Sequence, residues 1–188
     1  MFNLAIFISG LGTNAKNIME YFSNHRSIHV KLIVSNNSKS SLLNEETPYK
    51  QLSNTEFLKD GILLKLLKEY KITHIILAGF LLKITSSLIE NLPKKILNIH
   101  PSLLPEFGGK GMYGINVHKA VYSAKKTETG ITIHQVSSEY DEGKIIFQAK
   151  CPISKDDNPK DIMKKVQQLE YKFYPVIIEK YILYKNDN

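Results

Sequence analysis

The sequence predicts an α/β protein built on an open, mainly parallel, Rossmann-like sheet with helices on both faces. Short apolar segments of strand type alternate with segments whose apolar residues recur at helical spacing, as in 62–70 and 72–80. Glycine-rich or polar segments follow several of these strands, at the sheet edge where such folds bind ligands. Past residue 105 two strand-like runs follow one another, which predicts an antiparallel C-terminal addition to the sheet.

The individual elements follow from the same patterns. Before residue 101 we expect strands at 4–9, 28–35, 72–80 and 94–100, and helices at 14–22, 62–70 and 86–92, the last with a serine cap. Residues 36–60 carry a weak signal, although 41–46 are compatible with a turn of helix. After residue 105 we expect a glycine-rich loop at 106–114, a helix ending near Ala124, strands at 129–136 and 144–153, and a long C-terminal helix capped by Asn158 with Pro159 first. Because there is no repeat or linker, we expect one domain over 1–188.

The composition indicates a globular protein without membrane or disulfide chemistry. Apolar residues make up 43% and charged residues 23% of the 188 residues, and no apolar run reaches the roughly 18–20 residues that span a bilayer. The start lacks the basic segment and cleavage site of a signal peptide, so it is interpreted as the first strand. The single cysteine, Cys151, excludes an internal disulfide framework and a cysteine zinc site. We therefore expect a cytoplasmic protein.

The net charge of +7, from 25 basic and 18 acidic residues, raises the question of a nucleic-acid partner. The excess is almost entirely lysine scattered along the chain, with Arg26 the only arginine. We therefore favour a generally basic surface that attracts phosphorylated small molecules over a nucleic-acid patch. The histidines show no metal-ligand spacing, and we expect no metal. For His118 and His134, packing within a helix and a strand is the simpler interpretation.

The segment SGLGTN (9–14) is a glycine turn between the first strand and the first helix. Its glycines let backbone N–H groups approach an anion, and the helix N-terminus adds partial positive charge. The segment matches neither the P-loop nor the dinucleotide-binding fingerprint. By itself it fits a phosphate site and a tight turn without a ligand equally well.

The segment NIHPSLLP (98–105) places Asn98 and His100 two residues apart at a strand end, so their side chains share one face. An amide and an imidazolium there can both donate to one substrate oxygen, although neighbouring backbone could equally satisfy them. Asp141, in EYDEG (139–143), would raise the pKa of His100 if its loop reached that histidine. A loop of this kind is also typical of a solvated turn.

Taken in order, SGLGTN, LAGF, NIHPSLLP, the glycine loop with its Val-His pair, GITIHQV and EYDEG resemble the motifs of the folate-dependent formyltransferase family. The resemblance covers nearly the whole chain and is weakest over 37–60. It implies transfer of the formyl group of 10-formyltetrahydrofolate to the amine of 5-phosphoribosylglycinamide, a step of de novo purine biosynthesis. It also implies a phosphate-binding half at 1–100 and a half at 101–188 that carries folate-binding and catalytic loops.

The resemblance carries roles to particular residues. Asn98, His100 and Asp141 match the catalytic trio of the family, and His134 is a candidate supporting residue. The positions that match binding residues are Gly12, Thr13 and Asn14 for the substrate phosphate, Glu170 for the phosphoribosylglycinamide, and Leu81, Leu82, Lys83 and Ile84 with Asn98 for the folate pteridine. The backbone of 139–143 would close over the pteridine. Where the family often carries an arginine beside this pocket the chain has Leu82, so lysines such as Lys83 are expected to take over that contact.

The residue types suit the implied reaction. Attack of an amine on the formyl carbon creates a tetrahedral oxyanion, for which His100, as an imidazolium, and Asn98 are the expected donors. Asp141 would keep His100 protonated and help position a water that relays the proton from the amine to the leaving folate nitrogen. No covalent enzyme intermediate is needed, and the chain carries no nucleophile elbow.

Other members of the family stay open as alternatives. A methionyl-tRNA formyltransferase carries an RNA-binding domain, a formyltetrahydrofolate hydrolase usually has a regulatory domain, and a sugar-nucleotide formyltransferase usually has more chain. SGLGTN and Glu170 favour the phosphoribosylglycinamide substrate. The expected partners are therefore small-molecule substrates, with no nucleic acid and no membrane, and the expected state is a monomer or homodimer.

Overall fold

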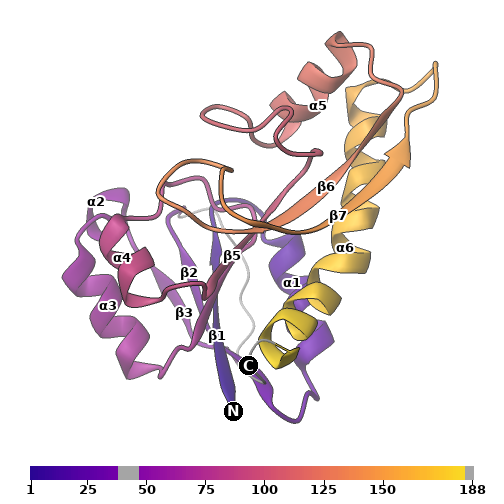
Figure 1. Ribbon diagram of the computed structural model, residues 1–188. Helices are drawn as coiled ribbons and strands as arrows, with labels where there is room; N and C mark the ends of the chain where they lie inside the picture. The colour runs from indigo at the N-terminus through magenta and orange to yellow at the C-terminus, as the bar shows by residue number, and fades with distance from the viewer. Residues whose placement is uncertain (38–46, 185–188) are drawn as a thin grey trace.

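The computed structural model describes residues 1–37 and 47–184 and contains a seven-stranded sheet in the order β3-β2-β1-β4-β5-β6-β7. Its strands are β1 (Phe2–Ile8), β2 (Ile28–Ser35), β3 (Tyr49–Gln51), β4 (His74–Leu77), β5 (Ile96–His100), β6 (Glu128–Gln135) and β7 (Ile145–Pro152). The pairings among β1 to β5 are parallel, whereas β6 pairs antiparallel with both β5 and β7. The mainly parallel sheet with an antiparallel addition is thus confirmed (Figure 1).

Helices cover both faces of the sheet, as the alternating pattern predicted. The helices are α1 (Thr13–Phe22), α2 (Asn54–Phe57), α3 (Asp60–Glu69), α4 (Ser86–Asn91), α5 (Ile115–Ser123) and α6 (Pro159–Tyr184). Ile18 of α1 and Ile178 of α6 belong to the core on one face, and Phe57 of α2 and Leu88 of α4 to the core on the other. The central strand β1 contributes alternate residues to both cores, which explains its unbroken apolar sequence.

Two short elements lie within residues 36–60, where the signal for secondary structure is weak. Strand β3 has three residues, too few to leave an alternating pattern, and α2 has four. A signal for α2 was nevertheless present: Ser53 Oγ accepts from the Glu56 N–H, and the Glu56 carboxylate accepts from the Ser53 N–H, which is a capping box. The expected helical turn at 41–46 lies outside the described residues.

The helix caps are a second point of comparison. The expected serine cap of α4 is wrong, because Thr85 occupies that position and its Oγ1 accepts from the Leu88 N–H at 3.3 Å. Thr85 has the extended backbone that an N-cap requires, and a threonine hydroxyl can accept the same bond. The expected Asn158 cap of α6 is confirmed, since Asn158 Oδ1 accepts from the Lys160 N–H at 2.8 Å.

The strand order reverses between β1 and β4, which opens a crevice at the carboxyl ends of these strands. The loops that follow the two strands are joined there through Ser9. Its N–H donates to the Gly79 carbonyl at 3.1 Å, and its Oγ accepts from the Leu81 N–H at 2.9 Å. The next strand, β5, pairs with β4 so that Asn98 lies opposite Leu77. Three of the expected site segments therefore meet at one sheet edge.

Helix α6 contains an interior proline, Pro175, which the sequence analysis did not use. Because proline has no N–H, the carbonyl of Tyr171 lacks its usual helical partner. Asn17 of α1 replaces that partner, since its Nδ2 donates to the Tyr171 carbonyl at 3.0 Å. The contact ties α1 to α6 next to Glu170, whose carboxylate accepts from Asn14 of α1 at 2.8 Å.

This tie gives a testable prediction for stability. Asn17→Ala should lower the free energy of unfolding by about 1–2 kcal/mol, because it leaves a partly buried carbonyl unpaired. In a Pro175→Ala background, residue 175 again has an N–H for the Tyr171 carbonyl, so Asn17→Ala should cost measurably less there. Urea unfolding of the four proteins of this double-mutant cycle measures the difference. An equal loss in both backgrounds would contradict this account of the proline.

Candidate active site

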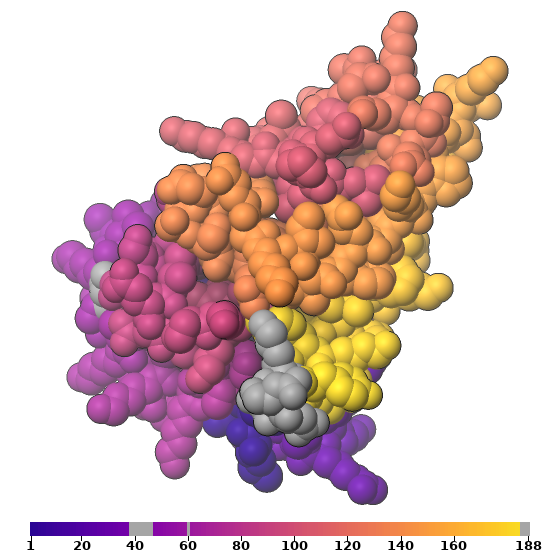
Figure 2. All heavy atoms as spheres, viewed as in Figure 1, coloured from indigo at the N-terminus to yellow at the C-terminus, as the bar shows by residue number. Residues whose placement is uncertain are grey.

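A cavity of about 520 Å³ opens at the carboxyl ends of β4 and β5. Its walls come from the β4–α4 loop, the end of β5, the glycine-rich loop, the segment after β6, and one side each of α5 and α6. Figure 2 shows the segment between β6 and β7 covering this edge of the sheet and reaching the surface formed around α4. The expected loop 137–143 is therefore part of the cavity wall.

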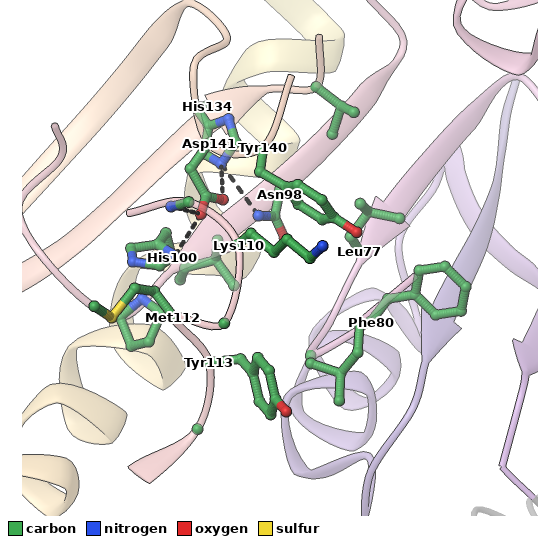
Figure 3. A pocket seen from close by; sticks show the side chains of 18 of the residues that line it. Leu77, Phe80, Asn98, His100, Lys110, Met112, Tyr113, His134, Tyr140 and Asp141 are labelled. Carbon is green, nitrogen blue, oxygen red and sulfur yellow. Dashed lines mark hydrogen bonds and ion pairs between the residues drawn. The ribbon is translucent and has the colours of Figure 1, made fainter. Parts of the chain in front are cut away.

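Asp141 lies between two histidines at the inner end of this cavity (Figure 3). Its Oδ2 is 3.4 Å from His100 Nδ1 and accepts from the Gly109 N–H at 2.9 Å. Its Oδ1 is 3.6 Å from His134 Nε2. The structure thus brings Asp141 to His100, as the sequence suggested, and adds His134 on the other side.

Charges and burial act in opposite directions on these groups. Burial alone would raise the pKa of Asp141, but the contact with His134, the charge of His100 and the Gly109 N–H together hold it below its usual value. Burial lowers the pKa of His100, while the Asp141 carboxylate and the Phe107 carbonyl oppose that shift. Asp141 is therefore ionised near neutral pH, and its charge is the largest influence that favours a protonated His100.

Both ring nitrogens of His100 face hydrogen-bond acceptors. Nε2 lies 2.8 Å from the carbonyl oxygen of Phe107, so it carries a hydrogen and donates. Nδ1 faces the carboxylate of Asp141 at 3.4 Å, which is longer than a good hydrogen bond. Protonating Nδ1 makes both contacts favourable and gives an imidazolium, so an anionic ligand beside Nδ1 would favour that form.

Asn98 and His134 form a cross-strand pair on β5 and β6. His134 Nδ1 donates to the Gln135 carbonyl at 2.8 Å, which leaves Nε2 as an acceptor in the neutral ring. Asn98 Nδ2 lies 3.1 Å from that nitrogen and donates to it. The amide nitrogen of Asn98 is thereby held toward His134, and its second hydrogen remains for a ligand in the cavity.

The residues expected to bind folate line another wall of the same cavity. Leu81, Leu82, Lys83 and Ile84 all contribute to it. Solvent exposure differs along this wall, because Ile84 is 5% exposed and Leu81 is 46% exposed. At the rim, Lys83 Nζ lies 3.3 Å from the Glu139 carboxylate and 5.7 Å from the centre of the Tyr140 ring.

The expected phosphate loop lies beside the cavity at the start of α1. Gly12 adopts a left-handed conformation (φ 77°), and α1 begins with neither a side-chain cap nor an acidic residue in its first turn. Its first N–H groups therefore suit an anion. Asn14 lines the cavity, whereas Gly12 and Thr13 lie just outside its lining. Burial raises the pKa of Glu170, which faces Asn14, although the Asn14 hydrogen bond opposes that shift.

His118 lies in the cavity wall, although the sequence pattern favoured packing within its helix. His118 of α5 is 2% exposed and lines the cavity, and among the described residues its Nδ1 has no hydrogen-bond partner. Packing within the helix explains why this histidine is buried, but it does not explain why Nδ1 has no hydrogen-bond partner in the described residues. The sequence could have pointed to it only through the Val-His pair that follows the glycine loop.

The described part of the chain has neither a metal-binding cluster nor a membrane-spanning helix. Residues 1–37 and 47–184 hold no group of three or more His, Cys, Asp or Glu side chains arranged for a metal. None of the helices in these residues has the length and apolar content that crossing a bilayer requires.

Known proteins are similar to this chain in both sequence and fold. The family described as "Formyl transferase" matches residues 2–178. A chloroplastic phosphoribosylglycinamide formyltransferase from Arabidopsis thaliana is 36% identical over 186 residues, covering 93% of this chain and 63% of the plant protein. The phosphoribosylglycinamide formyltransferase of Haemophilus influenzae is 30% identical over 189 residues, covering 95% of this chain and 86% of that protein.

Solved structures agree with these relatives. The structure of glycinamide ribonucleotide transformylase 1 from Geobacillus kaustophilus superposes with a TM-score of 0.85 at 30% identity, covering 95% of this chain and 97% of that one. The chain spans less than two thirds of the length of the plant relatives from Arabidopsis thaliana and Vigna unguiculata. Because the family match extends over most of the sequence and the fold agrees, the chain belongs to the formyl transferase family.

Proposed function

We propose that the protein transfers the formyl group of 10-formyltetrahydrofolate to the amine of 5-phosphoribosylglycinamide. The observation that carries the proposal is the placement of Asn98, His100 and Asp141 together at the inner end of one cavity. The relatives named for this reaction support the choice of both substrates. The uncapped N-terminus of α1 suits the substrate phosphate, and Glu170 beside it suits the ribose hydroxyls.

In the proposed reaction, the amine of phosphoribosylglycinamide attacks the formyl carbon and forms a tetrahedral oxyanion. The Asn98 amide hydrogen and the protonated Nδ1 of His100 donate to that oxygen. The bond from the formyl carbon to the folate nitrogen then breaks, and a water near Asp141 carries the amine proton to that nitrogen. Both substrates thus react directly, without a covalent bond to the protein.

The protonation state of His100 is the critical condition for these roles. Burial lowers the pKa of His100, so the ring relies on the Asp141 carboxylate for its second proton. The negative charge that develops on the oxyanion adds to this effect as the reaction proceeds. His134 supports the arrangement by holding the Asn98 amide and by contacting the second carboxylate oxygen of Asp141.

The folate would lie against residues 81–84 and beneath the segment 139–143. Ile84 and Leu82 give an apolar surface for the pteridine, and Lys83 at the rim would attract the glutamate tail.

The division into a phosphate-binding half at 1–100 and a folate and catalytic half at 101–188 stays a prediction. So do the cytoplasmic location, the monomeric or dimeric state and the absence of a nucleic-acid partner.

The substrates are tested by following folate release from 10-formyltetrahydrofolate by absorbance. We expect release only when phosphoribosylglycinamide is present, with one formylated product formed for each folate released. Ribose 5-phosphate, which lacks the amine, is the matched control and should give no release. Release at the same rate without the amine substrate would instead indicate a hydrolase, and no release under either condition would contradict the proposal.

The pairing of His100 with Asp141 predicts a change in pH dependence. Asp141→Asn keeps an oxygen for the Gly109 N–H but removes the charge that favours protonated His100. The pKa of His100 should fall further, so the imidazolium is lost at lower pH. The turnover number at neutral pH should drop on the order of 10²-fold, and the remaining activity should rise as the pH is lowered.

Steady-state rates between pH 5 and 9 measure this effect. Asp156→Asn, which removes an exposed carboxylate from the loop before α6, is the charge-matched control and should keep the wild-type profile. A folded Asp141→Asn variant with an unchanged pH profile would show that Asp141 does not set the protonation of His100.

A further inference from the structure

We infer that His118 is a substrate-binding residue whose ring nitrogen Nδ1 forms a hydrogen bond with the glycinamide portion of the amine substrate. The inference rests on the proposed function, and it assigns a new contact within the same cavity. It also replaces the interpretation of His118 as a packing residue of α5.

The first support is the unpaired nitrogen itself. In the described part of the chain, three buried side-chain atoms lack a hydrogen-bond partner: Asn14 Oδ1, His118 Nδ1 and Thr129 Oγ1. The first two belong to residues that line the cavity. A buried polar atom without a partner destabilises the folded protein, so such atoms are uncommon and call for an explanation. A ligand that fills the cavity supplies the missing partner.

The second support is the wall on which His118 lies. Helix α5 packs against α6, as Figure 1 shows, and Gln167 and Glu170 of α6 line the same cavity. The folate wall at 81–84 belongs to the other part of the sheet edge, after β4. His118 therefore shares its wall with Glu170 and faces the amine substrate rather than the folate.

The position along that substrate follows from two neighbours. The ribose is expected to contact Glu170, and the amine is expected to contact Asn98 and His100. His118 is close enough to His100 for the charge of one ring to affect the other. The part of phosphoribosylglycinamide that joins its ribose to its amine is the glycinamide amide group. That group is the portion within reach of His118.

The chemistry of the ring fits an amide. Burial, and then the charge of His100, lower the pKa of His118 to about 4, so its ring is neutral at physiological pH. A neutral imidazole has one nitrogen that donates and one that accepts. An amide offers both an N–H and a carbonyl oxygen, and either can pair with Nδ1. A ring with so low a pKa is a poor base, so His118 binds the substrate and does not take its proton.

Replacing the ring with an apolar side chain tests this assignment. His118→Leu removes an unpaired buried nitrogen, so the melting temperature of the ligand-free protein should stay the same or rise. The KM for phosphoribosylglycinamide should rise about tenfold, as expected for the loss of one hydrogen bond to the substrate. The KM for 10-formyltetrahydrofolate should not change. The rise in melting temperature on adding phosphoribosylglycinamide alone should shrink accordingly.

Two amide variants serve as matched controls. His118→Asn places a polar atom near the position of Nδ1 and should recover most of the affinity, whereas His118→Gln places its amide further out and should not. If His118→Leu fails to fold, this comparison still decides the question. Equal KM values for phosphoribosylglycinamide in the Asn and Gln variants would contradict the assignment.

Two further outcomes would also overturn it. A His118→Leu protein that melts lower without ligand but binds phosphoribosylglycinamide normally would show that the histidine only packs α5. If His118→Leu raised only the KM for 10-formyltetrahydrofolate, His118 would contact the folate and not phosphoribosylglycinamide. A wild-type protein that neither binds phosphoribosylglycinamide nor transfers a formyl group would instead refute the proposed function, because that result does not involve the variant.

Discussion

The buried carboxylate of Asp141 is the feature on which the arrangement of the site depends. A carboxylate removed from water is stable only when other groups compensate its charge. Here the Gly109 N–H donates to one carboxylate oxygen and the His100 ring lies beside that oxygen, while His134 contacts the other oxygen. These partners come from the glycine-rich loop, β5 and β6, so one ionised group holds three separate segments around the inner end of the cavity.

The close approach of these segments sets a steric condition at Gly108. A Cβ added there would lie 2.6 Å from Leu104 Cδ2 and 3.3 Å from Asp141 Cβ. A side chain at this position would therefore require the Leu104 side chain to shift and would press closely against Asp141. Phe107 and Asp141, on the two sides of this contact, both adopt left-handed backbone conformations (φ 56° and 58°). Residues in this region are strained, and such strain is often found at functional sites.

Much of the fold could be predicted from the sequence because its strands and helices differ clearly in apolar spacing. The expected boundaries of the strand at 28–35 agree with β2, and the antiparallel pair after residue 128 was recognised from two consecutive strand-like runs. The edge strand β3 could not be recognised, since three residues do not establish a period. The interior Pro175 does not end α6, and Asn17 pairs the carbonyl that the proline leaves open.

The site was predictable where side chains follow strand ends, and less so where it depends on register. Asn98 and His100 were expected to share a face because they lie two residues apart on one strand. That Asn98 faces His134 depends on the register of β5 and β6, which the sequence does not specify. His118 was assigned to packing because its distinguishing feature is an unpaired buried nitrogen, and hydrogen bonding cannot be predicted from periodicity.

The central claim is that His100 acts as an imidazolium maintained by Asp141. The most direct measurement is ¹⁵N NMR of the histidine rings in the complex with phosphoribosylglycinamide and a folate analogue whose N10 is replaced by carbon. Such an analogue accepts the amine but cannot release its formyl carbon, so it holds a tetrahedral adduct whose oxygen takes the place of the oxyanion. At pH 7.5 the account predicts protonated shifts for both ring nitrogens of His100. An unprotonated Nδ1 of His100 in the wild-type complex would contradict it.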